Sequence, residues 1–434
     1  MTSGDHDYSG QTIADPDFRG RVFKEAVDFS GCTFTGRADF SEAVFEGRVS
    51  FSRAVFEQFA DFRNTRFDGS ACFTEAVFEN DLTFEDVTVG GALRLDRACF
   101  EQASRIGPAR ADEVDLSLVV FQRRVRIELV TRLVRCERGR FVEGAQFLLD
   151  GADLILKDSD LGGASLLASY TAPHDVYDPD RRPRLVTLSG TDVANLTVSR
   201  VDLSAAKLMN AHNLDQMRIR PDDAFGWTPG TFRIARRQVI GDEVRWRAKN
   251  GPARSRWKLP EGWPDLDAPR TAGDVSKAYQ ALRKGREEAR DEPGAADFYY
   301  GEMEMRRLGT RLRGKEQWRE RNVRGWLAAR GEYTLLWLYW LMSGYGLRAW
   351  RAFTALAVLV AGAAAGFLEW GFPAGTSMDY PGAVRYTLRA ATSLLRGTDQ
   401  ALTPTGEWIE LGVRFLGPVL LGLALLALRG RVRR

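Results

Sequence analysis

Bulky apolar side chains recur along the N-terminal half of the chain at steps that alternate between five and six residues. Because residues two apart in an extended backbone point to the same side, these rings and the small residues two places before them face one interior. The polar residues between them, Asp28, Asp39, Ser50 and Asp61, are expected to face solvent. The predicted core ladder consists of Phe18, Phe23, Phe29, Phe34, Phe40, Phe45, Phe51, Phe56, Phe62, Phe67, Phe73 and Phe78.

A helical coiled coil is the main alternative, since an 11-residue apolar repeat can produce a right-handed supercoil. However, positions five apart on a helix lie about 140° around its axis and cannot form one narrow seam. The repeats also contain Gly31, Gly36, Gly47 and Gly69, and they are rich in Phe, Val and Thr, which favours strands over helix. We therefore predict short β-strands.

The sequences ADFSEAVFEG and SFSRAVFEQF resemble the pentapeptide-repeat family, whose consensus is A(D/N)(L/F)xx. The resemblance implies a right-handed quadrilateral β-helix, in which four short faces complete one coil and the central ring stacks inside. Each coil would then consist of two consecutive 11-residue units, which stacks Phe18 over Phe40 and Phe62. The expected fold class is a β-solenoid followed by an α-helical region and a two-helix transmembrane hairpin.

The repeat region is expected to occupy residues 18–219, after a disordered N-terminus at 1–17 that has no apolar signal sequence. The register fades over 101–170 and returns from Leu188 through Leu208. An insert at 171–184 contains three prolines and is predicted to be a loop.

Residues 220–272 hold six prolines and four tryptophans, so an irregular linker or cap is expected there. A helical juxtamembrane region is predicted for 273–350, with a first helix beginning at Asp274. Two segments, GAADFYYGEMEMRR at 294–307 and LYWLMSGYG at 338–346, are similar to signatures of bacterial pentapeptide-repeat proteins with a C-terminal membrane domain. The GYG within the second segment is predicted to be a turn.

Two apolar runs follow. Residues 352–368 carry no charge over roughly 25 Å of helix, and residues 408–428 cover roughly 31 Å, so both can cross a hydrocarbon core. The expected domain is a transmembrane hairpin at 351–434 with a short loop helix at 382–397. Basic residues precede the first span and end the chain, which predicts a multi-pass protein of the cell membrane with both termini cytoplasmic.

Charge separates the two halves of the chain. Residues 18–219 have 31 acidic and 26 basic side chains, whereas residues 220–434 have 23 and 35. Within 306–330, nine Arg or Lys stand against two Glu. Because this stretch lies beside the apolar runs, anionic lipid headgroups are the expected partner and nucleic acid is not.

The order of span, short helix and span resembles the protomer of a two-helix channel. The candidate pore or intersubunit residues are Thr392, Ser393, Arg396, Glu410, Arg414, Gly417 and Pro418. Gly362 and Gly366 would permit close helix packing. No TVGYG filter follows Ser393, and Arg396 near a pore mouth would oppose cation selectivity.

No catalytic residues, metal site or cofactor are predicted, because the chain has no GxSxG, no phosphate-binding GxxxxGK and only three scattered histidines. The cysteines form no CxxC pair and are expected to be free thiols. Two hypotheses remain open. One is a homo-oligomeric, channel-like assembly whose cytosolic β-helix acts as a sensor or interaction surface. The other is a membrane-tethered scaffold whose β-helix recruits an unknown protein.

Overall fold

A computed structural model describes residues 7–171, 181–220, 224–229, 236–251, 256–264, 266–373, 378–392 and 401–432. The chain forms two compact units, Met1–Phe298 and Tyr299–Arg434. The first contains a parallel β-solenoid with helices at its C-terminal end, and the second is helical. The predicted fold class, a β-solenoid followed by helices that include two candidate spans, is confirmed.

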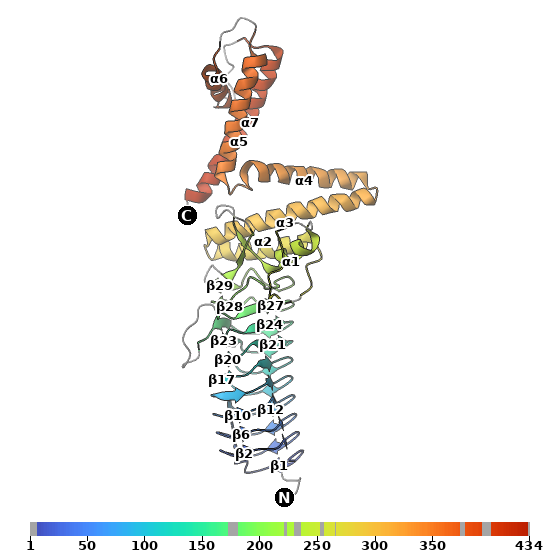
Figure 1. The fold of residues 1–434 in the computed structure, drawn as a ribbon, viewed down its shortest axis with the longest axis vertical. Coiled ribbons are helices and arrows are strands. Elements are labelled where there is room, and N and C mark those ends of the chain that lie inside the picture. Colours follow the sequence, from blue (N-terminus) through green and yellow to red (C-terminus); the bar gives the residue numbers. More distant parts are fainter. Residues whose placement is uncertain are drawn as a thin grey trace. The chain divides into compact units, whose positions relative to one another are not determined.

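The solenoid consists of parallel strands stacked in chain order (Figure 1). Its longest sheet contains β2 (Val22–Phe23), β6 (Val44–Phe45), β10 (Arg66–Phe67), β14 (Val87–Val89), β17 (Arg105–Arg110), β20 (Val125–Val130), β23 (Ala145–Asp150), β26 (Ser165–Ser169), β28 (Leu196–Ser199) and β29 (Arg218–Arg220). These ten strands correspond to about ten coils.

The other faces are formed by two eight-stranded sheets and one three-stranded sheet. One contains β1 (Thr12–Ile13), β4 (Thr33–Phe34), β8 (Val55–Phe56), β12 (Val77–Phe78), β16 (Cys99–Phe100), β19 (Val120–Phe121), β22 (Arg140–Phe141) and β25 (Asp160–Leu161). The next contains β3 (Val27–Asp28), β7 (Val49–Ser50), β11 (Ala71–Cys72), β15 (Ala92–Arg94), β18 (Glu113–Asp115), β21 (Leu133–Glu137), β24 (Asp153–Lys157) and β27 (Arg184–Thr187). The shortest contains β5 (Ala38–Asp39), β9 (Ala60–Asp61) and β13 (Leu82–Thr83).

The first coils have a constant length, because Val22 pairs with Val44 and Val44 pairs in turn with Arg66. Their interior is a ladder of parallel rings. Phe40 stacks on Phe18 with 4.9 Å between ring centroids and on Phe62 with 5.0 Å. All twelve ladder phenylalanines are buried. A ring inside the ladder therefore contacts an identical ring above and below, so each coil presents the same packing surface to the next coil.

After residue 100 the coil becomes shorter. The register there pairs Val120 with Arg140 and Val125 with Ala145, so that the same position returns sooner along the chain than in the first coils. In the sheet that begins with β2, strands lengthen from two residues in β2 to six in β20 and β23. The segment where the 11-residue pattern fades is therefore a continuation of the solenoid with shorter coils and longer strands.

Two of the four polar residues expected to face solvent are buried. Asp39 and Asp61 retain 6% and 0% exposure. Each carboxylate accepts the backbone N–H two residues later, which closes a corner of the coil. Arginine side chains cover both, and Arg63 donates to Asp61 at 2.7 Å. Ser50 is half-buried, whereas Asp28 is exposed as expected.

The C-terminal end of the solenoid is capped by the short hairpin β30 (Gly226–Trp227) and β31 (Gln238–Val239) and by the helices α1 (Gly241–Asn250) and α2 (Ala272–Glu288). Asp242 accepts the backbone N–H groups of Leu208 at 2.8 Å and Met209 at 3.2 Å, while Arg245 donates to the carbonyl of Ala205. These contacts satisfy backbone groups that a terminal coil would otherwise leave open. The segment expected to be an irregular linker or cap thus contains a cap in which α1 is an ordered helix.

A buried ionic network supports this cap. Glu243 accepts two hydrogen bonds of 2.7 Å from Arg237, one of 2.6 Å from Arg247 and one from the hydroxyl of Tyr279. Helix α2 starts differently from its prediction, because Thr271 is the N-cap and Asp274 closes a capping box from the third helical position.

The second unit contains the remainder of α3 (Glu292–Arg319), followed by α4 (Val323–Ser343), α5 (Ala349–Gly366), the π-helical turn η3 (Phe367–Gly371), α6 (Tyr380–Thr392) and α7 (Pro404–Val432). Helical segments Ala349–Gly371 and Pro404–Leu425 are long and apolar enough to cross a membrane. The GYG is a turn, as predicted, with positive φ at Gly344, Tyr345 and Gly346.

Candidate functional site

Helix α6 packs against both candidate spans. Ala390 and Ala391 of α6 form a buried cluster with Val413 of α7, and Ala363 of α5 and Ile409 of α7 pack on its edge. At the start of the loop, the ring of Phe367 meets Tyr386 edge-on at 5.0 Å. The segment between the spans is thus tied to both helices through small residues and one aromatic contact.

Two of the predicted glycines lie at helix contacts. A Cβ on Gly417 would come within 2.9 Å of the carbonyl oxygen and Cα of Ala391, so this position must be glycine for α6 to approach α7. A Cβ on Gly366 would meet Ile409 of α7 at 3.3 Å. Gly362 faces open space, and Pro418 lies inside the continuous helix α7.

The polar candidates are not gathered in one place. Glu410 and Arg414 form an ion pair of 2.5 Å on successive turns of α7 and are largely buried. Thr392 ends α6, where its hydroxyl donates to the carbonyl of Leu388. Ser393, Arg396 and the rest of the expected loop helix up to residue 397 lie outside the described residues.

The two signature segments meet in one cluster. Trp340 donates its indole N–H to the hydroxyl of Tyr300 at 3.0 Å. Tyr345, in the GYG turn, is buried and meets the rings of Tyr300 and Tyr339 edge-on at 5.2 and 5.7 Å. Met303 and Leu336 complete the cluster. The turn thus connects α3 to the residues that begin α5.

Three arginines surround these rings. Arg307 and Arg351 lie over Trp340 at 4.5 and 5.0 Å, and Arg348 lies over Tyr300 at 4.9 Å. Arg351 also donates to the backbone carbonyl of Trp340. Each partly desolvated cation–π contact contributes on the order of 0.5 to 2 kcal/mol. Together they fix the junction of α3, α4 and α5. In the sequence, both segments are dense in aromatic residues, and arginines lie in or just after them. Which of these residues contact one another depends on the turn at Tyr345 and could not be predicted from that density.

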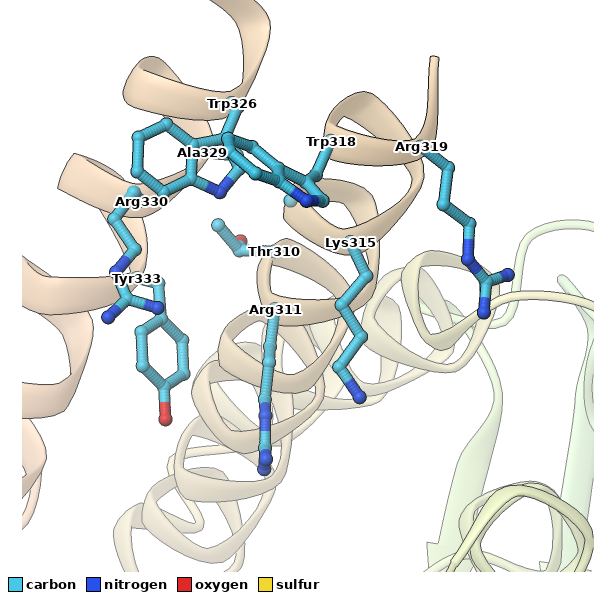
Figure 2. A pocket seen from close by; sticks show the side chains of 10 residues that line it. Thr310, Arg311, Lys315, Trp318, Arg319, Trp326, Ala329, Arg330 and Tyr333 are labelled. Atoms are coloured by element: carbon cyan, nitrogen blue, oxygen red, sulfur yellow. The ribbon is translucent and has the colours of Figure 1, made fainter. Parts of the chain in front are cut away.

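A groove of about 780 Å³ lies between α3 and α4 (Figure 2). Arg311, Lys315 and Arg319 project from successive turns of α3, and Arg330 and Tyr333 enter from α4. The indoles of Trp318 and Trp326 meet at one end, with 5.2 Å between ring centroids. The arrangement combines cationic and aromatic walls, which suits an anion with an adjoining apolar part.

The cysteines lie in the solenoid and are free thiols. Burial raises the pKa of Cys99 to about 11 and that of Cys136 to about 12, so both are protonated at neutral pH. Among the residues that the structure describes, no group of His, Cys, Asp and Glu could hold a metal ion.

Comparison with known proteins identifies the repeats. A family model described as pentapeptide repeats (9 copies) matches residues 18–66 and 62–110. The match ends close to the point where the coils become shorter. No curated protein and no solved structure matches the chain.

Proposed function

The solenoid of this chain belongs to the pentapeptide-repeat family, and from that premise we propose that the protein is a non-enzymatic, integral-membrane assembly of several copies with a channel-like hairpin. In this proposal, both termini are cytoplasmic, and the solenoid is a cytosolic surface that senses or binds a protein partner. The hairpin crosses the cell membrane twice.

The observation that carries this proposal is the docking of α6. A helix of 13 residues is too short to span a bilayer, yet its Ala390 and Ala391 pack against α7 with no room for a side chain at Gly417. A simple anchor does not require a helical re-entrant segment held between its spans. A two-helix pore does, and it also requires several copies around one axis.

Large apolar side chains on the spans are consistent with an assembly in lipid. Val358 on α5 and Phe415 on α7 are exposed in the single chain, as are Trp350 and Trp408 near the span ends. They would contact lipid or a neighbouring copy. The filter of a potassium channel has no counterpart in the sequence after α6, so cation selectivity of that kind is not part of the proposal.

The test combines oligomeric state with conductance. The full-length protein in detergent is expected to be an oligomer by mass photometry and to conduct ions in planar bilayers. Gly417→Val should abolish conductance, because the new side chain collides with the backbone of Ala391 and overpacking costs about 1 to 3 kcal/mol. Gly412→Val is the matched control, since a Cβ at Gly412 meets nothing within 4 Å. A strictly monomeric protein without conductance would refute the proposal.

A membrane-tethered scaffold is the second candidate. Its support is the ion pair of Glu410 and Arg414, which forms within one helix rather than between copies. In a scaffold, the hairpin only anchors the chain. Replacement of residues 348–434 by an unrelated two-helix anchor would then preserve function, whereas a pore requires its own helices.

A further inference from the structure

The cations of α3 and α4 differ in whether an acidic side chain pairs with them. Arg306 and Arg313 both bond to Glu332, at 3.1 and 3.4 Å, and Arg307 bonds to Glu304. By contrast, the structure gives no ion pair to any of the four cations that line the groove, within the described stretch 266–373: Arg311, Lys315, Arg319 and Arg330. Glu304 and Glu332 thus neutralise three cations outside the groove, whereas Arg321 and Arg324, also outside the groove, have no ion pair among the described residues.

Like charges at this spacing oppose the folded helix. Arg311, Lys315 and Arg319 follow one another at i, i+4, and each such pair destabilises a helix by roughly 0.2 to 0.5 kcal/mol. Glu316, the acidic residue between them in sequence, does not line the groove. An anion in the groove would relieve this repulsion and satisfy several donors at once.

Phosphate matches these donors best. Guanidinium groups bind phosphate oxygens through paired, charge-assisted hydrogen bonds, and Lys adds a mobile point charge. The groove is lined by three guanidinium-bearing side chains and one ammonium-bearing side chain (Figure 2). A monocarboxylate could use at most one or two of them.

We infer that the groove between α3 and α4 is a binding site for a phosphate-bearing anion. Arg311, Lys315 and Arg319 contact its oxygens from α3, Arg330 contacts them from α4, and the indoles of Trp318 and Trp326 cover the carbon atoms next to the phosphate. The site is a defined pocket within a stretch that would otherwise be a diffuse basic surface.

Exposed apolar side chains on α4, one of the two helices that form the groove, favour a lipid headgroup as the source of the phosphate. Val323, Leu327, Leu338 and Leu341 recur at helical spacing along α4 and are exposed. Trp318 is 62% exposed, and indoles favour the headgroup level of a bilayer. This choice of source rests on the proposed membrane location, whereas the phosphate chemistry does not, and neither depends on conductance.

The experiment uses the full-length protein in a neutral detergent. Phosphatidic acid, phosphatidylglycerol and phosphatidylcholine are titrated separately, and bound lipid is counted by native mass spectrometry. Inorganic phosphate and glycerol 3-phosphate form the soluble arm and are tested as competitors. The double variant Arg311→Gln/Lys315→Gln is compared with Arg321→Gln/Arg324→Gln. This control removes the same charge from exposed positions of the same basic stretch that do not line the groove.

The two anionic lipids are expected to bind and phosphatidylcholine is not. The groove variant should weaken binding by about tenfold or more, because two charge-assisted contacts are lost, while the control changes it by less than about threefold. Competition by millimolar inorganic phosphate would assign a soluble source to the same site, and failure of soluble phosphates to compete would assign the lipid. Equal loss in both variants, or no binding in either arm, would overturn the inference.

Discussion

The coils before residue 100 and the coils after it form one solenoid, but different interactions hold them together. In the first group, strands are mostly two residues long and identical rings stack closely, as Phe51 does on Phe73 at 4.8 Å. In the second group, ring stacking continues through Phe121 and Phe141 on one face only, while β20 and β23 pair over six residues. Side-chain stacking thus gives way to backbone pairing and aliphatic packing.

This difference explains why the repeat is clear in the sequence of the first coils and fades in that of the later coils. A ladder of rings requires the same residue at each step, so its period is visible in the sequence. Backbone pairing is nearly independent of side-chain identity, and paired interior positions of the later coils hold different apolar residues, as Ile127 opposite Phe147 shows. The later coils continue the same parallel sheets, but with register shifts at Ile106/Ala109 and Leu154/Ile155, and their sequence repeats less.

The largest expected effect comes from the ladder. Phe62→Ala should lower stability by about 3 to 5 kcal/mol, because the ring is fully buried and stacks on both Phe40 and Phe84 at 5.0 Å. Hydrogen exchange in the full-length protein should increase in the coils above and below. Leu149→Ala, in a six-residue strand, is expected to cost less and to increase exchange mainly within its own coil.

Phe59→Ala is the control for this comparison. Phe59 is a phenylalanine of the same coil that lies outside the ladder, where Arg37 covers its ring. Its replacement should leave exchange in neighbouring coils unchanged. If Leu149→Ala increased hydrogen exchange in the neighbouring coils as much as Phe62→Ala does, stacking and backbone pairing would be equally cooperative. The proposed contrast between the two groups of coils would then be wrong.

Much of the fold could be predicted from the sequence for physical reasons. The alternation of five and six residues excludes a helical seam, and the apolar runs are long enough to cross a membrane. The shortening of the coil after residue 100 could not be predicted, because the 11-residue repeat of the first coils predicts the same coil length for the whole solenoid. A linker or cap was expected after the solenoid, but the contacts of the cap could not be predicted, since Asp242 and Arg245 act through backbone groups of a coil that is distant in the sequence.

The candidate site was only partly predictable. The basic stretch before the spans is visible in the sequence, and so are the two aromatic signatures. Which cations remain without an acidic partner depends on the position of Glu332 on the facing helix, which pairs with Arg306 and Arg313. The role of Gly417 also depends on a tertiary contact, because its neighbour Ala391 belongs to another helix.

The cap and the coils also differ in how they hold a buried carboxylate. Burial raises the pKa of Asp242 to about 6 from an ordinary value of 3.8, although two backbone N–H groups donate to it. The folded protein therefore takes up this proton at a higher pH than the unfolded chain. Stability of the cap should rise by roughly 2 kcal/mol as the pH falls from about 7 to about 4.

Asp242→Asn should remove this pH dependence, because the amide oxygen still accepts the backbone hydrogen bonds without a buried charge. Exchange of residues 205–210 and α1, measured in the full-length protein at several pH values, reports the effect. Asp160→Asn is the control, since this carboxylate is exposed on the solenoid. An unchanged pH profile in Asp242→Asn would mean that groups other than Asp242 determine the pH dependence of the cap's stability.

The smallest expected effect concerns Asp61, whose pH dependence has the opposite sign. Burial alone would raise the pKa of Asp61, but hydrogen bonds from Arg63 outweigh it and hold the pKa below its ordinary value. Its contribution is thus present at neutral pH and is lost as the pH falls below about 4. Asp61→Asn should cost about 1 to 2 kcal/mol at pH 7, because a charge-assisted bond becomes a neutral one. Asp28→Asn, at the equivalent corner but exposed, should cost less than about 0.5 kcal/mol. Hydrogen exchange of β5 and β9 in the two variants tests this order, and equal costs would mean that the covering arginines add nothing to the corner turn.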